Sequence, residues 1–289
     1  HDVHRALQAG IFYAALAQPA EHPAHNRSVA GSIPARGTKH QKKGERRVEL
    51  YNGDCLGVMK NIPDNSVDMI LADLPYGTTK NDWDSVIPFA PLWAQLKRII
   101  KHGGAIALHA DMPFTAKLVC SNLPWYRYEL IWEKPQGTDF LNAGRKPIKN
   151  HESIQLFSEG QITTYNPQFT YGTPYIQKSK PSSKNYGSAS SWVTVSEGAI
   201  SKNGFKSMPD KEKIHPTQKP IELESWLIRT YTNPGEKVLD CCMGSGSTGV
   251  ACIRESREFI GIEKDAEYFR IAKMRLEQEQ AAGQQLSLL

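Results

Sequence analysis

Short apolar runs alternate with amphipathic segments along most of the chain, and their lengths indicate which element each run forms. Strands are expected over residues 48–51, 68–73, 105–109, 128–132, 153–157, 237–240 and 259–263. Apolar side chains at helical spacing predict helices over 91–101, 113–123, 220–232 and 265–280, and a glycine-rich turn entering a helix over 244–254. Gly103-Gly104 is expected to end the helix that begins at residue 91. Strands that alternate with helices favour an α/β fold with an open, mostly parallel, doubly wound sheet.

Two segments depart from this alternation. Residues 1–46 lack sustained periodicity and are rich in Ala, Pro, His, Arg and Gly, so we expect a disordered tail. Within it, Gly31-Ser32-Ile33-Pro34 reads like a translated arm of a transfer-RNA gene, which suggests a mis-called start or read-through from an adjacent gene. From residue 159 to 214, Ser, Lys, Gly, Pro and aromatic residues dominate, and this composition predicts a loop-rich insertion.

Charge and cysteine content narrow the class of protein. The net charge of +5 lies in residues 1–47, which hold eight Lys and Arg against three acids, while the other 27 basic and 27 acidic residues balance. Residues 134–219 still hold twelve basic residues against six acidic ones, an excess expected of a nucleic-acid contact region. Five irregularly spaced cysteines form no disulfide or zinc pattern, and no apolar run is long enough to span a bilayer. We therefore expect a cytoplasmic protein without a membrane partner.

The second half of the chain carries a glycine-rich turn between a strand and a helix. Gly244 and Gly246 follow the strand that ends at Asp240, and glycine permits a tight turn and close approach of a ligand. Glu263 ends the next strand, 17 residues after Gly246, where a carboxylate can accept hydrogen bonds from both hydroxyls of a ribose. Gly-x-Gly alone has low specificity, so a nicotinamide enzyme stays open at this point.

A second motif, Asp73-Leu74-Pro75-Tyr76, also follows a buried strand. Ligands of open α/β sheets bind outside the carboxyl ends of the strands, so this motif and the glycine turn can share one crevice. The exocyclic amine of a base is a poor nucleophile because its lone pair is delocalised into the ring. The Asp73 carboxylate and the Leu74 carbonyl can accept hydrogen bonds from the two N–H groups of this amine, and Pro75 fixes the turn that orients the carbonyl. Tyr76 can stack on a flipped base. The motif therefore predicts methyl transfer to a base amine.

These motifs resemble the amino-DNA methyltransferases that carry an Asp-Pro-Pro-Tyr type motif, and their order resembles the β group of that family. The segment His215-Pro216-Thr217-Gln218-Lys219-Pro220 matches the one that precedes the cofactor helix in that group. Asn81-Asp82-Trp83-Asp84 is similar to members from phages and bacteria. The resemblance covers roughly residues 48–279, and it implies a circularly permuted S-adenosylmethionine-dependent methyltransferase fold.

The resemblance also implies a role for each matching residue. The catalytic residues are Asp73, Leu74, Pro75 and Tyr76, although Leu74 stands where the family motif has Pro. The residues implied to contact S-adenosylmethionine are Asp240, Gly244, Gly246, Thr248, Glu263, Asp54, Lys219 and Pro220, and no metal is implied. Asp54 also reads as an ordinary turn acid. Asp at the first position is typical of adenine-N6 members, whereas cytosine-N4 members usually carry Ser. We therefore expect a site-specific adenine methyltransferase, with cytosine N4 as the alternative.

The resulting organisation is a tail over 1–46, a catalytic half of the core over 47–133, a target-recognition region over 134–214 and a cofactor-binding half over 215–289. The middle region interleaves basic and aromatic residues, which is typical of contacts with double-stranded DNA. Arg145, Lys146 and Asn150 are candidates for base contacts by residue type alone. Two readings from other classes are a nicotinamide-dependent oxidoreductase and an inactive DNA-binding module. A homodimer and a cognate restriction endonuclease also stay open.

Overall fold

The computed structural model describes residues 47–78, 84–138, 140–168, 170–171, 175–178, 193–196, 199–200, 204–206 and 218–286. The chain divides into two units, residues 1–43 and 44–289, and the description below concerns the second. The predicted tail and most of the predicted insertion lie outside the described residues.

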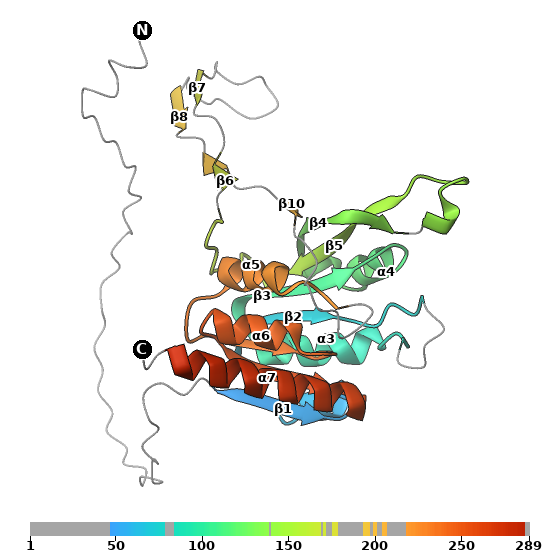
Figure 1. Ribbon diagram of the computed structural model, residues 1–289, viewed down its shortest axis with the longest axis vertical. Coiled ribbons are helices and arrows are strands. Elements are labelled where there is room, and N and C mark those ends of the chain that lie inside the picture. Colours follow the sequence, from blue (N-terminus) through green and yellow to red (C-terminus); the bar gives the residue numbers. More distant parts are fainter. Residues whose placement is uncertain are drawn as a thin grey trace, which may run out of the picture. The chain divides into compact units, whose positions relative to one another are not determined.

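An eight-stranded sheet organises the second unit (Figure 1). Its spatial order is β1 (Val48–Asn52), β12 (Glu258–Glu263), β11 (Lys237–Asp240), β2 (Val67–Asp73), β3 (Ile100–Ala110), β5 (Lys149–Phe157), β4 (Tyr126–Thr138) and β10 (Gly204–Lys206). β5 runs antiparallel to its neighbours β3 and β4, and every other pair in this sheet is parallel. The predicted open, mostly parallel α/β sheet is confirmed.

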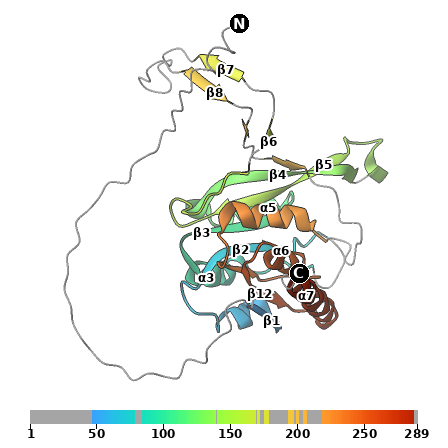
Figure 2. The same cartoon turned by 60° about the vertical axis from the view of Figure 1, so that its left-hand side comes forward.

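Helices cover both faces of the sheet because its central strands are apolar on both sides. In β2, Ile70 and Ala72 join a core with α2 (Cys55–Met59), α3 (Phe89–Ile99) and α4 (Phe114–Ser121). The alternate residues Met69 and Leu71 join a second core with α5 (Ile221–Tyr231), α6 (Ser247–Arg254) and α7 (Ala266–Leu286). Figure 2 shows the sheet between α3 on one side and α6 and α7 on the other. Such double burial explains why the strand reads as one continuous apolar run.

The structure corrects several predicted boundaries. The helix expected to end at Gly103-Gly104 ends at Ile99, and β3 begins at Ile100. The glycines instead lie inside β3, where Gly103 has φ +71° and the pairing with β2 changes register. A glycine with positive φ allows such a β-bulge without the strain that a side chain would bring. The helix predicted over 113–123 ends at Ser121 and is followed by a short 3-10 helix, η1 (Leu123–Trp125).

The predicted loop-rich insertion also contains strands that the sequence pattern did not indicate. β6 (Thr170–Tyr171) pairs with β9 (Ala199–Ile200), and β7 (Tyr175–Lys178) pairs with β8 (Val193–Ser196), both antiparallel. These strands have two to four residues, which is too short for a periodic pattern to stand out in the sequence. The strands predicted over 128–132 and 153–157 are longer than expected, because β4 and β5 form an extended hairpin.

The strand order changes direction between the parallel neighbours β11 and β2. From β2 the chain proceeds to β3, whereas from β11 it proceeds to β12 on the opposite side. In doubly wound sheets this reversal opens a crevice at the carboxyl ends of the two strands. Asp73 ends β2 and Asp240 ends β11, so the fold brings both predicted motifs to this position.

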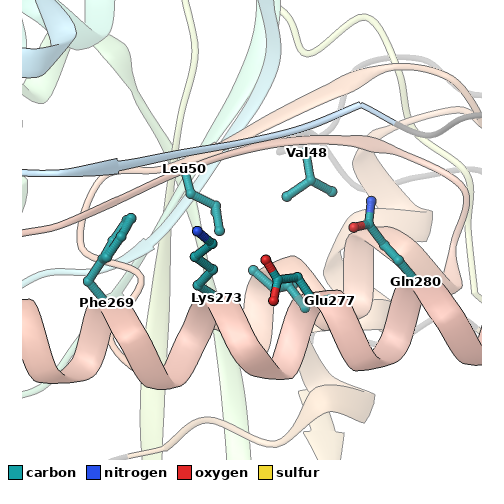
Figure 3. A pocket seen from close by; sticks show the side chains of 7 residues that line it. Val48, Leu50, Phe269, Lys273, Glu277 and Gln280 are labelled. Atoms are coloured by element: carbon teal, nitrogen blue, oxygen red, sulfur yellow. The ribbon is translucent and has the colours of Figure 1, made fainter.

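A separate hollow of about 280 Å³ lies along the edge strand β1. Val48 and Leu50 line it from β1, while Phe269, Lys273 and Glu277 line it from α7 (Figure 3). It shares no residue with the predicted catalytic and cofactor groups.

Candidate active site

The Asp73-Leu74-Pro75-Tyr76 turn is fixed at both ends. Leu74 is buried in the core, and the Tyr76 hydroxyl donates a hydrogen bond of 2.7 Å to Asp73 Oδ1. The Tyr76 ring stacks on Phe114, with 5.0 Å between the ring centroids. Burial, followed by the charge of Asp73, holds the pKa of Tyr76 well above its ordinary value, so the phenol remains a donor. The Asp73 side chain is still 26% exposed and can be reached by a substrate.

Lys219 bridges two carboxylates at this turn. Its ammonium lies 2.9 Å from Asp73 Oδ2 and 3.2 Å from Glu152 Oε2, and its side chain is 10% exposed. Lys134 also pairs with Glu152. Burial alone would raise the pKa of Glu152, but Lys219 and Lys134 outweigh it and lower that pKa to about 2. Burial likewise opposes the charge of Lys219, yet Asp73 and Glu152 raise its pKa. The result is a buried, compensated cluster of charges.

The position of Lys219 refines its predicted role. Its ammonium contacts the catalytic carboxylate, whereas the sequence resemblance had placed Lys219 among the cofactor contacts. Pro220 stands directly before α5, and α5 packs against α6, the helix that follows the glycine turn. The segment therefore connects the two halves of the crevice.

The glycine turn has the backbone geometry that its sequence predicts. Gly244 and Gly246 have φ +51° and +82°, in the left-handed region that favours glycine. A Cβ at Gly244 would meet no atom within 4 Å, so open space lies beside this turn. Thr248, in the first turn of α6, is buried and hydrogen-bonds to Asp240.

Two carboxylates flank the glycine turn. Asp240 is 3% exposed and accepts a hydrogen bond of 3.0 Å from the Cys242 N–H. Burial raises the pKa of Asp240 to about 7, although the hydrogen bonds from Thr248 and Cys242 act in the opposite direction. Glu263 accepts hydrogen bonds of 2.8 Å from the N–H groups of Gly244 and Asp265, and burial raises its pKa. Both acids therefore lie at the turn where a nucleoside ligand was predicted.

Asp54 has a structural role in addition to its predicted one. Its side chain accepts hydrogen bonds of 3.0 and 3.2 Å from the N–H groups of Leu56 and Gly57, and so caps α2. The adjacent Gly53 N–H donates to the Glu263 carbonyl at 2.9 Å, which brings this cap to the edge where Glu263 lies. A contact between Asp54 and the cofactor stays a prediction.

The sequence analysis missed a second buried pair. His109 is the β3 partner of Asp73 in the strand register, and its Nε2 lies 3.0 Å from Glu224 Oε1 on α5. Both side chains are 1% exposed. Burial lowers the pKa of His109, but Glu224 outweighs it and the net pKa is raised. A histidine at the end of an apolar strand was the only available signal, because its partner is far away in the sequence.

Asp84 supports the loop that follows the catalytic turn. Its carboxylate accepts hydrogen bonds of 2.8 and 2.9 Å from the N–H groups of Gly77 and Thr78. Asp84 had been noted in the sequence only as part of a resemblance.

Among the described residues, no cluster of three or more His, Cys, Asp or Glu is arranged to hold a metal ion. No helix in the described part of the chain is both long and apolar enough to cross a membrane.

Comparison with known proteins identifies the family. Residues 67–274 match the family model of the N6/N4 DNA methylases, so the chain belongs to this family and is a DNA methyltransferase. The Type II methyltransferase M1.MboII of Moraxella bovis is 28% identical over 267 residues, which cover 80% of this chain and 96% of that protein. The DNA adenine methyltransferase YhdJ of Escherichia coli (strain K12) is 27% identical, with 83% and 86% covered. The nicotinamide-enzyme reading is thereby excluded.

Solved structures agree with the fold. A complex of M1.HpyAVI with S-adenosylmethionine is 25% identical to this chain, has a TM-score of 0.56 and covers 79% of this chain and 100% of its own. The cytosine-N4-specific PvuII DNA methyltransferase is 17% identical, has a TM-score of 0.60 and covers 80% and 89%. At this identity the second likeness concerns the fold alone.

Proposed function

We propose that this DNA methyltransferase modifies N6 of adenine at a specific DNA sequence, with Asp73 as the acceptor of an amine hydrogen. The observation that carries this proposal is the Asp73 carboxylate at the end of β2, held by Lys219 and Tyr76 beside the glycine turn of β11. Asp at this position is typical of adenine-N6 members of the family. The E. coli relative is also named as an adenine methyltransferase.

The residues around the glycine turn fit S-adenosylmethionine, which is the cofactor of the family. Open space beside Gly244 admits a ligand close to the backbone, and Glu263 can accept hydrogen bonds from a ribose there. The buried Asp240 carboxylate suits the cationic methionine end, because an opposite charge favours its ionised form. When bound, the cofactor supplies an electrophilic methyl group on a sulfonium.

The chain's own residues prepare the amine for methyl transfer. A carboxylate has about four lone-pair sites, so Asp73 can accept an amine N–H in addition to its contacts with Tyr76 and Lys219. The Leu74 carbonyl accepts the second N–H, and the two bonds localise the nitrogen lone pair toward the methyl donor. After transfer, the nitrogen carries a positive charge and must lose a proton. Asp73, which accepts one of the amine hydrogens, takes this proton, and its 26% exposure lets the proton reach solvent.

Incubating the protein with DNA and S-adenosylmethionine, then identifying the modified nucleoside by mass spectrometry, tests this proposal. N6-methyladenine is the expected product, and Asp73→Ala should abolish it while leaving DNA binding intact. N4-methylcytosine would overturn the adenine assignment. Unchanged turnover in Asp73→Ala would overturn the role of Asp73. Methylation-sensitive sequencing of the product also maps the recognition sequence.

The remaining partners are proposed on the same basis. Residues 134–214 form the target-recognition region, because their basic excess suits contact with DNA phosphates. Two Moraxella bovis relatives are Type II methyltransferases by name, and we extend to this chain an endonuclease partner with the same recognition sequence. DNA methylated by this enzyme should then resist that endonuclease. A homodimer is tested by measuring the mass of the protein in solution.

A further inference from the structure

The tip of the β4–β5 hairpin exposes large apolar side chains. Phe140 and Leu141, in the 3-10 helix η2 (Phe140–Asn142), are 71% and 86% exposed, the highest values among the large hydrophobic residues that the structure describes. Ile148, at the other end of the connection, is 48% exposed. Scattered exposed apolar residues are ordinary, but three within nine positions of one protruding tip indicate a contact surface.

The tip is a formed structure with its own hydrogen bonds. The Ala143 N–H donates to the Phe140 carbonyl at 3.1 Å, and the Arg145 N–H donates to the Asn142 carbonyl at 2.8 Å. At the base of the tip, Lys149 pairs with Asp111, which follows β3. These contacts present the apolar side chains on a defined turn.

The hairpin projects from the edge of the sheet that carries Asp73. Strand pairing places Asp73 level with His109, His109 level with Ile154, and Ile154 level with Leu130. From Leu130, β4 continues for eight residues to Thr138, which pairs with Lys149. The register shifts between Glu133 and Thr138, so the five residues of β5 from Ile154 to Lys149 give the reach of the hairpin beyond the catalytic edge, roughly 17 Å at about 3.3 Å per residue. Figure 1 shows β4 and β5 reaching past the neighbouring strands.

The charge of the tip favours a polyanionic partner. From Asp139 to Lys149 the chain holds three basic residues, Arg145, Lys146 and Lys149, against the single acid Asp139, a net charge of +2. Arg145 and Lys146 are both exposed. Apolar side chains bordered by cations match a duplex, whose stacked bases are apolar and whose phosphates are anionic.

We propose that Phe140 and Leu141 form a wedge that enters the DNA duplex beside the target base and stabilises its flipped state. The inference rests on the proposed function, because a base must leave the stack to reach Asp73. Phe and Leu are side chains that insert between base steps in other DNA-binding proteins. A two-stranded ribbon fits the major groove, whose depth of about 8.5 Å is well within the reach of the hairpin. Arg145 and Lys146 then contact the adjacent phosphates.

The test compares two duplexes that carry the mapped recognition sequence. One is fully paired, and the other has an abasic position opposite the target base, so that flipping requires less unpairing. Phe140→Ala/Leu141→Ala should lower kcat/KM on the paired duplex on the order of tenfold, and on the abasic duplex about threefold or less. Arg145→Ala/Lys146→Ala should weaken binding to both duplexes alike and reduce its salt dependence.

Leu123→Ala is the matched control. Leu123 is 59% exposed and precedes β4, at the opposite edge of the sheet, so its substitution should leave both duplexes unaffected. Equal losses on the two duplexes, or no loss, would overturn the wedge. A change from dimer to monomer in Phe140→Ala/Leu141→Ala without DNA would instead assign the tip to contact between copies. Wild-type methylation of either duplex supports the proposed function independently of these outcomes.

Discussion

Lys219→Met removes an ammonium that contacts both Asp73 and Glu152. In the wild type, Lys219 and Lys134 lower the pKa of Glu152 from the ordinary 4.5 to about 2, against the opposing effect of burial. Each pKa unit corresponds to ~1.4 kcal/mol, so the net shift of Glu152, with the cost of burial included, corresponds to ~3 kcal/mol of stability at neutral pH. Since Asp73 also loses its cation, we expect Lys219→Met to reduce the free energy of unfolding by ~2 kcal/mol. This corresponds to a fall in Tm of about 4–8 °C.

The pH dependence of this loss distinguishes an electrostatic effect from a packing effect. A carboxyl group whose pKa is lowered by folding adds stability above its unfolded pKa, and that stability is lost as the pH falls toward the folded value. The difference between wild type and Lys219→Met should therefore stay near its maximum from pH 7 down to about pH 5 and shrink as the pH falls from about 4.5 toward about 2. Urea unfolding at several pH values measures it. A difference that stays constant with pH would refute the reasoning.

Lys134→Met is the matched control for activity. Lys134 and Lys219 both pair with Glu152, but among the described ion pairs it is Lys219 that contacts Asp73. Both variants should lose stability. Because Lys219 positions the Asp73 carboxylate, Lys219→Met should also lower kcat on the order of 100-fold with little change in cofactor affinity, whereas Lys134→Met should lower kcat much less. Equal losses of kcat in the two variants would contradict a positioning role.

Three further predictions concern the cofactor half and the tail. Burial raises the pKa of Asp240 to about 7, so its ionisation destabilises the folded state as the pH rises from about 4 to about 7. Asp240→Asn should therefore be most stable relative to wild type above pH 7, and urea unfolding that shows a pH-independent difference would contradict this. Gly244→Ala adds strain at φ +51° beside open space, so calorimetry should show weaker cofactor binding with a stability loss of only ~1 kcal/mol. Gly249→Ala should do the reverse, because its Cβ would come within 2.7 Å of Leu276 and Phe259 atoms, and equal cofactor affinities would refute this contrast. A chain that starts at Arg47 should keep full methylation activity, because the described strands and helices begin at Val48, and loss of activity would show that residues 1–46 contribute to function.

The sequence predicted the sheet and the crevice because both depend on local patterns. Apolar runs such as residues 68–73 report burial directly, and a strand end followed by Gly244-x-Gly246 reports a turn that only glycine forms easily. The position of Gly103-Gly104 was misread, because a glycine pair fits a helix end and a β-bulge equally well without knowledge of the neighbouring strand.

The charged side chains behind Asp73 could not be predicted in the same way. Glu152 and Lys219 are 67 residues apart, and only the antiparallel pairing of β4 with β5 and the start of α5 bring them together. A Lys or Glu in a sequence is most often solvated, so residue type does not signal such a pair. Strand register, which local periodicity does not determine between distant strands, decides these contacts.

The same register connects the two proposals made above. Glu152 lies at the base of the β4–β5 hairpin, and it contacts Lys219, which in turn contacts Asp73. We expect displacement of the hairpin tip on DNA to reach the catalytic carboxylate through this buried ion pair, and the position of that carboxylate relative to the amine affects the rate. Truncation at the tip and loss of Lys219 would then affect one another, because residues in one network show non-additive energies. Combining Lys219→Met with Phe140→Ala/Leu141→Ala and measuring kcat/KM on the paired duplex tests this coupling. Additive losses in the combined variant would show that the hairpin contacts DNA without acting on Asp73.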